Sequence, residues 1–177
     1  MTVKRLTSLA MYTTLALIIF TIESAIPPIV PIPGIKLGLA NIITLVVLHE
    51  YSSKDAFYVL LLRIILASFF FGQAISLLYS LAGGIACLIA MICIHRLLQK
   101  HFLYLVSIVG ALFHNLGQLG IAYLLTNTKG VWTYLPFLML SGILTGLFTG
   151  LCAHFMLRYL KPLKAAVPSS PKEDDDN

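Results

Sequence analysis

Residues 56–71 read AFYVLLLRIILASFFF, an apolar run that is interrupted near its middle by Arg63. A guanidinium at bilayer depth costs at least about 2.5–3.5 kcal/mol, so such an arginine usually has a partner and often a function. Other polar residues also lie within or beside apolar segments of the chain: Glu23, Lys36, Asn41, His114, Asn115 and Gln118. We interpret these residues together with Arg63 as one polar pocket in the outer half of a small helical membrane protein.

The composition is that of an integral membrane protein with a single domain. Of the 177 residues, 59% are hydrophobic and 11% are charged, with a mean hydropathy of +0.93, whereas a soluble domain is typically about 25% charged. The net charge of +5 does not indicate nucleic-acid binding, because the basic residues lie at the ends of apolar segments rather than on one polar face. The three cysteines fall in apolar runs without a Cys-x-x-Cys pair, which favours buried structural thiols over a metal site.

The lengths of the apolar segments predict an all-α membrane protein with a bundle of six transmembrane helices, since about 20 residues span a bilayer. The predicted helices cover about residues 6–26, 35–48, 54–71, 74–98, 102–125 and 134–160. The second is short for a full span, so it is either little tilted, ends below the surface or begins within a re-entrant loop. The first ends at Pro27-Pro28 without a cleavage site, and we expect it to act as an uncleaved signal. We expect a transmembrane domain over residues 1–162 and a disordered, polar, cytoplasmic tail over 163–177.

The distribution of lysine and arginine predicts that both termini are cytoplasmic. With the N-terminus inside, the outer side receives only Lys36 and Lys129, and Arg63 stays within the membrane. The inner side receives the other nine basic residues: Lys4, Arg5, Lys54, Arg96, Lys100, Arg158, Lys161, Lys164 and Lys172. An excess of basic residues in the short cytoplasmic loops is the rule for membrane proteins.

Within this topology the polar residues lie between mid-membrane and the outer surface. His114 and Gln118 are four residues apart, and Asn115 and Gln118 are three apart, so we expect all three to share one face of a helix. Lys36 and Arg63 carry two positive charges against the single negative charge of Glu23. The resulting positive field favours a carboxylate or phosphate ligand.

The same residues also have purely structural interpretations. Arg63 would then form a salt bridge to Glu23 that ties two helices, and Lys36 would simply extend to water. The His114, Asn115 and Gln118 side chains would make interhelical hydrogen bonds, worth about 0.6 kcal/mol on average. Small residues at Gly142, Gly146 and Gly150 predict close helix packing within the bundle. The sequence shows no motif for catalysis or nucleotide binding, so we do not expect an enzyme.

Several segments carry a resemblance to a known family: Pro33-Gly34-Ile-Lys36-Leu-Gly38-Leu-Ala-Asn41-Ile, Leu62-Arg63-Ile, Tyr79-Ser-Leu-Ala-Gly-Gly84 and His114-Asn115-Leu-Gly117-Gln118. Over about residues 6–160 the chain resembles the bacterial Gx transporter family, also labelled heptaprenyl diphosphate synthase component I. That family is similar to the S components of energy-coupling factor transporters. S components are six-helix proteins that hold a substrate near the outer face and dock on a transmembrane coupling subunit, which two cytoplasmic ATPases drive.

The resemblance implies that the substrate is bound by Lys36, Asn41, Arg63, His114, Asn115 and Gln118. We expect Glu23 to hold Arg63 in place. The lid over the substrate would be the first loop, with Pro27, Pro28, Pro31, Pro33 and Gly34. S components dock through an Ala-x-x-x-Ala stripe on the first helix, whose nearest equivalent here is Ala10-x-x-x-Thr14.

The sequence therefore predicts the substrate-binding subunit of an ATP-driven uptake transporter in a bacterial cell membrane. The substrate would be a small, anionic vitamin, quinone or isoprenoid precursor, and no cofactor is implied. One alternative is a membrane accessory subunit of a heptaprenyl diphosphate synthase. Another is a stand-alone proton-coupled carrier that uses Glu23 and His114.

Overall fold

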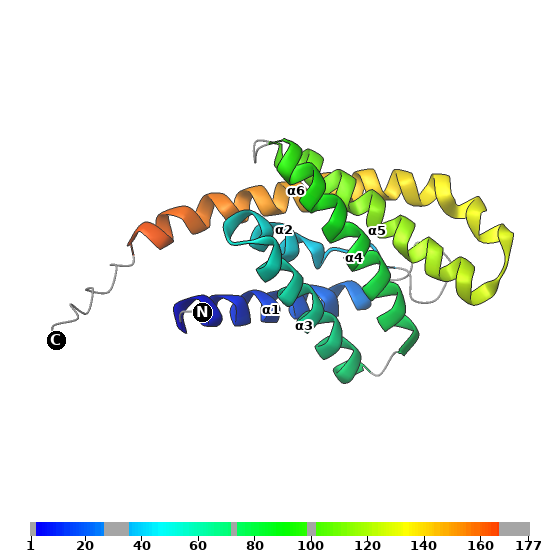
Figure 1. The fold of residues 1–177 in the computed structure, drawn as a ribbon, viewed down its shortest axis with the longest axis horizontal. Coiled ribbons are helices and arrows are strands. Elements are labelled where there is room, and N and C mark those ends of the chain that lie inside the picture. Colours follow the sequence, from blue (N-terminus) through cyan, green and yellow to red (C-terminus); the bar gives the residue numbers. More distant parts are fainter. Residues whose placement is uncertain (1–2, 27–35, 72–73, 99–101, 167–177) are drawn as a thin grey trace.

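The computed structural model describes residues 3–26, 36–71, 74–98 and 102–166, and the regular elements within these ranges are all helical. They are α1 (Val3–Ser24), α2 (Asn41–Glu50), α3 (Ser53–Phe71), α4 (Ala74–Leu97), α5 (Leu103–Thr126), the short 3₁₀ helix η1 (Lys129–Tyr134) and α6 (Leu135–Ala166) (Figure 1). The prediction of an all-α protein is confirmed.

Four of the described helices are long and apolar enough to cross a membrane, so the chain is a multi-pass membrane protein. These candidate spans are Val3–Ser24, Ile75–Leu97, Leu103–Thr126 and Lys129–Leu160. Helix α3 is 19 residues long but carries three charged residues, at positions 54, 55 and 63. Helix α2 has ten residues and is therefore about 15 Å long, half of a hydrocarbon core of about 30 Å. Six full spans thus remain a prediction.

Helix α2 forms the centre of the bundle, between α1 and α6 in Figure 1. Every residue from Asn41 to Leu48 is buried, and Leu45, Val46 and Val47 have no exposed surface. A helix that is apolar all round is one that is buried all round. The main hydrophobic core gathers around α2 and includes residues of α1, α3, α4, α5 and α6.

The start of α2 differs from the predicted start at residue 35. Residues 36–38 are not helical, and α2 begins at Asn41. The reason lies at Gly38, whose φ of +80° is a left-handed conformation that L side chains rarely adopt. A Cβ at this position would also lie 2.8 Å from the ring of His114. The chain therefore turns at Gly38, and the Asn41 N–H donates to the Gly38 carbonyl at 3.0 Å.

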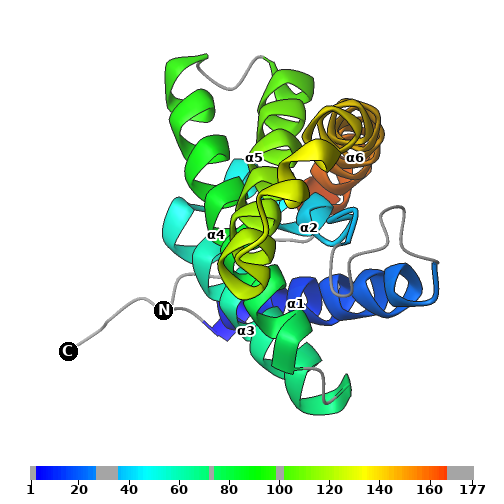
Figure 2. The same ribbon diagram turned by 90° about the vertical axis from the view of Figure 1, so that its right-hand side faces the viewer.

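Helix α5 packs between α4 and α6 (Figure 2). The predicted close packing of the α6 glycines is confirmed, because a Cβ on Gly142, Gly146 or Gly150 would meet atoms of α5 at 2.6–3.1 Å. The α4 side is equally close: a Cβ on Gly117 would lie 2.7 Å from the Ala82 carbonyl oxygen. Small residues thus bring three helix backbones together where the lipid supplies no hydrophobic driving force.

The start of α1 and the end of α6 lie at the same end of the bundle (Figure 1). An ion pair between Arg5 on α1 and Asp55 on α3 ties this end together. Ser52 caps α3 there, since its Oγ accepts from the Asp55 N–H at 3.2 Å and donates to the Asp55 carboxylate at 2.6 Å.

Two other sequence expectations need correction, and two lie beyond what the structure covers. Helix α6 continues to Ala166, beyond its predicted end at residue 160, and the domain boundary at residue 162 stays a prediction. Cys93 is exposed rather than buried, whereas Cys87 is buried and Cys152 is half-buried. The predicted lid residues, 27–34, and the remainder of the tail, 167–177, lie outside the described residues.

Substitution of Gly146 by alanine should weaken the bundle, because the new Cβ would lie 2.6 Å from the backbone Cα of Ile108. The two helices would have to separate, and overpacking of this kind typically costs about 1–3 kcal/mol. Unfolding of the purified protein in detergent by heat or by added denaturant measures the loss. Gly120→Ala on α5 is the matched control, since nothing lies within 4 Å of its Cβ position. Equal stability of the two variants would contradict the close approach of α6 to α5.

Candidate functional site

Glu23, in the last turn of α1, binds the backbone just before α2. Its side chain is 4% exposed, and its Oε1 accepts a hydrogen bond from the Gly38 N–H at 2.5 Å. A carboxylate in this position is also favoured by the positive end of the α2 dipole. The alternative of a Glu23–Arg63 salt bridge is wrong, because within the described part of the chain the ion pair found is Arg5–Asp55.

Gln118 of α5 holds the backbone of Lys36 with both ends of its amide. We orient the amide so that each of its polar atoms finds a partner. Its nitrogen then donates to the Lys36 carbonyl at 3.0 Å, and its oxygen accepts from the Lys36 N–H at 3.2 Å. The side chain is 1% exposed, so these bonds are shielded from solvent. Gln118 therefore bonds both the N–H and the carbonyl of Lys36, as a residue of a neighbouring β-strand would.

His114 completes this network from one turn earlier on α5. Its Nε2 lies 3.1 Å from the Gln118 amide oxygen in the orientation described above, and its Nδ1 lies 3.1 Å from the Asn41 amide nitrogen. The tautomer with its hydrogen on Nε2 forms both bonds. The ring is closed in by two glycines, since a Cβ on Gly38 or on Gly83 would lie 2.8–2.9 Å from its atoms. Both ring nitrogens are thus engaged, and the His114 ring fills the space between α5, α4 and the start of α2.

Asn115 faces a different neighbour from His114 and Gln118. Its amide nitrogen donates to the Leu138 carbonyl of α6 at 2.6 Å. A Cβ on Gly142 of α6 would lie 2.9 Å from the same nitrogen. The expectation that all three polar residues of α5 point the same way is therefore wrong for Asn115, which joins α5 to α6.

The Lys36 side chain extends away from its tethered backbone toward α1. Its ammonium donates to Ser24 Oγ at 2.7 Å and lies 3.7 Å from the centroid of the Phe20 ring, a cation–π contact. Partial burial lowers the pKa of this ammonium from its ordinary value, and the Arg63 charge adds to the shift, whereas the Glu23 carboxylate opposes it. The structural interpretation of Lys36 as a residue that merely extends to water does not describe this geometry.

Arg63 on α3 is the one predicted site residue that remains largely unpaired within the described residues. It is 4% exposed, and its Nε and Nη2 atoms have no hydrogen-bond partner there. Its charge is close enough to act on Glu23, Lys36 and His114. The structure thus brings together Glu23, Lys36, Asn41, Arg63, His114 and Gln118, and it places Asn115 apart.

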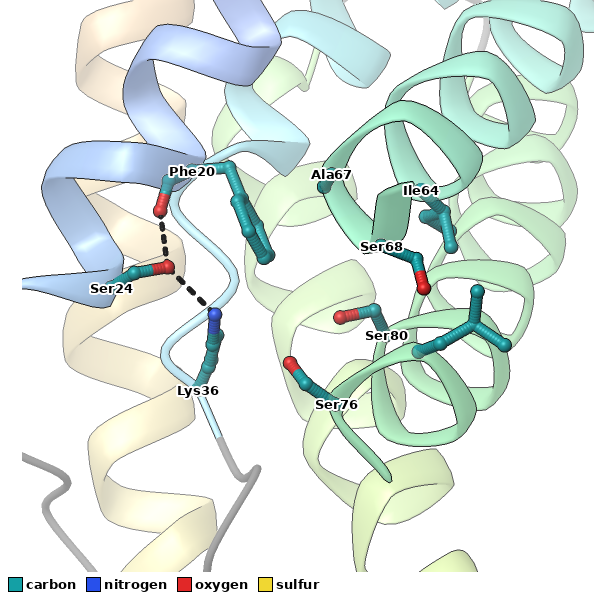
Figure 3. Close-up of a pocket in the computed structure, with 9 residues that line it drawn as sticks. Phe20, Ser24, Lys36, Ile64, Ala67, Ser68, Ser76 and Ser80 are labelled. Atoms are coloured by element: carbon teal, nitrogen blue, oxygen red, sulfur yellow. Dashed lines mark hydrogen bonds between the residues drawn. The ribbon is translucent and has the colours of Figure 1, made fainter. Parts of the chain in front are cut away.

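Sequence reasoning missed a pocket that opens beside Lys36, between α1 on one side and α3 and α4 on the other (Figure 3). Its polar lining comes from Lys36 and from four serines at positions 24, 68, 76 and 80. The sequence signal was Ser76 and Ser80, which are four residues apart in an apolar helix and therefore share a face. Within the described residues, no group of three His, Cys, Asp or Glu side chains is placed to hold a metal ion.

Comparison with known proteins assigns the chain to a family. The family model described as heptaprenyl diphosphate synthase component I matches residues 12–156. The matched range includes every described residue of the polar network and of the pocket. A search of curated proteins finds no match.

The tether on Lys36 gives a testable expectation. Gln118→Leu removes both bonds to the Lys36 backbone, so the amides of residues 36–38 should exchange their hydrogens about tenfold faster or more. Hydrogen–deuterium exchange followed by mass spectrometry measures this in detergent or nanodiscs. Asn115→Leu is the matched control: it removes an amide of the same helix that bonds α6 instead. Slow exchange at 36–38 in the Gln118 variant would show that Gln118 does not hold the segment.

Proposed function

Given that the chain belongs to the heptaprenyl diphosphate synthase component I family, we propose that it is the substrate-binding membrane subunit of an energy-coupling factor type transporter. It would capture a small anionic molecule from outside the cell, a vitamin, quinone or isoprenoid precursor. In this proposal the chain crosses a bacterial cell membrane six times, with both termini in the cytoplasm. The shared position of the start of α1 and the end of α6 supports an even number of crossings.

The observation that carries the proposal is the buried, largely unpaired guanidinium of Arg63. A buried charge is costly unless it is paired and hydrogen-bonded, and two of the three guanidinium nitrogens lack a partner among the described residues. Glu23, the nearest candidate, is engaged by the Gly38 N–H. An anionic ligand would supply the missing acceptors, in the bidentate geometry that arginine favours, and would add a negative charge to that of Glu23, which already attracts Arg63.

The segment from residue 36 to the start of α2 supports the same function. It is held by Glu23, Gln118 and His114 through side chains of α1 and α5, and it follows directly on the proline-rich stretch of residues 27–34. Release of these few bonds would free the segment without unfolding a span. We propose that ligand binding and release at Arg63 are coupled to this segment.

Docking on a coupling subunit is supported by the exposed face of α1. Ala10 and Thr14 are both exposed, and the Thr14 hydroxyl donates to the Ala10 carbonyl at 3.0 Å. The side chains on this face are therefore small, and the Thr14 hydroxyl already has its hydrogen-bond partner within the helix. Such a surface allows another helix to approach closely. We propose that the transmembrane coupling subunit, with its two ATPases, binds here.

A second candidate function is favoured by the family's description. The chain would then be a membrane accessory subunit of a heptaprenyl diphosphate synthase, and the same anion site would bind that enzyme's substrate or product. A stand-alone proton-coupled carrier is less well supported, because Glu23 and His114 are both engaged in the network. Uptake that requires the ATPases supports the first function. Synthase activity that depends on this chain, without uptake, supports the second.

Replacement of Arg63 by methionine should strongly weaken ligand binding while it preserves the fold. Methionine removes an unpaired buried cation, so the unfolding temperature should stay equal or rise. The loss of a buried charge–charge contact should weaken ligand binding roughly hundredfold. Mass spectrometry of the small molecule that co-purifies with the wild-type protein identifies the ligand, and equilibrium binding of that ligand measures the loss.

Arg96→Met is the matched control, since Arg96 is exposed in the last turn of α4. Its ligand affinity should equal that of the wild type. An Arg63→Met protein that is folded and retains wild-type affinity would remove the basis of the proposed function.

A further inference from the structure

The serine-lined pocket beside Lys36 is not used by the function proposed above. Figure 3 shows Phe20, Ser24 and Lys36 on one side of it, and Ala67, Ser68, Ser76 and Ser80 on the other, with the serine hydroxyls of α3 and α4 directed into the gap. The apolar part of the lining is Phe20, Ile64, Ala67 and Leu77. The pocket thus has hydrogen-bond donors on both walls and one positive charge.

Ser76 is the informative residue of this wall. It is 6% exposed, and its Oγ has no hydrogen-bond partner among the described residues. Hydroxyls elsewhere in this bundle bond back to the carbonyl one turn earlier: Thr13, Thr14, Thr21 and Ser24 on α1, and Thr145 on α6, do so at 2.8–3.0 Å. A buried hydroxyl without such a bond costs free energy unless something else pairs with it.

The Lys36 ammonium also has N–H donors that are not used within the described residues. An ammonium has three N–H donors, and the described residues accept one of them, at Ser24 Oγ. The nearest carboxylate, Glu23, acts on Lys36 through its charge but forms no ion pair with it within the described residues. The pocket therefore presents donors and a positive charge rather than acceptors.

The size of the pocket limits what enters it. The centres of water molecules can occupy about 30 Å³ of it, which is room for roughly two or three waters. That space suits a single carboxylate or phosphate group rather than a whole vitamin. The rest of a larger ligand would have to lie outside the pocket.

We propose that the pocket between Lys36 and the serines at 68, 76 and 80 binds an oxyanion group, a carboxylate or phosphate, of either a soluble molecule or a lipid headgroup. Lys36 supplies the charge, and Ser76 and Ser80 donate from one face of α4. Ser68 donates from α3. Arg63 does not line the pocket, although its charge acts on Lys36, and the inference holds whether the chain serves uptake or a synthase.

The test uses the full chain in nanodiscs of phosphatidylcholine. Saturation-transfer NMR with methyl phosphate and acetate measures the binding of soluble oxyanions. A parallel sample in nanodiscs that also contain phosphatidic acid is examined by native mass spectrometry for retained anionic lipid. The variants are Ser76→Ala with Ser80→Ala, and Ser68→Ala alone in case the double variant does not fold. The control is Ser141→Ala on α6, whose hydroxyl bonds the Leu138 carbonyl outside the pocket.

We expect saturable binding of at least one class of probe. The dissociation constant should rise about tenfold or more in the serine variants and stay unchanged in the control. Binding of methyl phosphate or acetate identifies a soluble ligand, and retention of phosphatidic acid alone identifies a lipid headgroup. Either result supports the site. No binding of any probe, or equal binding by wild type and folded serine variants, would overturn it. None of these variants changes Arg63, so the proposed function is tested separately.

Discussion

The hydrogen bond from the Gly38 N–H to the Glu23 carboxylate is the constraint on which the rest of this bundle depends. It joins the end of α1 to the turn that starts α2. Gly38 has to be in a left-handed conformation for that turn, and only a residue without a Cβ leaves room for the His114 ring beside it. His114 in turn is in place because Gly83 leaves the matching room on α4. One buried carboxylate and two glycines thus fix where α2 begins.

The polar residues of the bundle fall into two groups with different roles. The first group forms hydrogen bonds within the protein, to one another and to the backbone of residues 36–38: Glu23, Asn41, His114 and Gln118. Arg63 and Lys36 keep unused donors. The unused charge is therefore positive, which agrees with the anion preference inferred from charge alone, and Asn41 Oδ1 remains as a buried acceptor without a partner among the described residues. This division also explains how one cluster stabilises the fold and still binds something else.

The helical class and the ends of α3, α4 and α5 could be predicted to within about one residue, because charged residues or glycines mark where each apolar run stops. The start of α2 could not, since the turn at Gly38 is set by tertiary contacts with α1 and α5. The direction of Asn115 was missed because successive residues are about 100° apart around a helix, enough to give His114 and Asn115 different neighbours. The serine pocket was missed because a sequence does not tell which hydroxyls bond back to their own helix.

The ten-residue α2, enclosed on every side, has a consequence for the permeability of the membrane. Leu45, Val46 and Val47 have no exposed surface, so the axis of the described bundle is filled with hydrocarbon. A hydrated ion would have to shed its water to cross that layer, at a prohibitive cost. Around α2, the described residues therefore leave no room for a standing column of water. A polar solute could pass this layer only if the packed helices rearranged, and not by diffusion through a preformed channel.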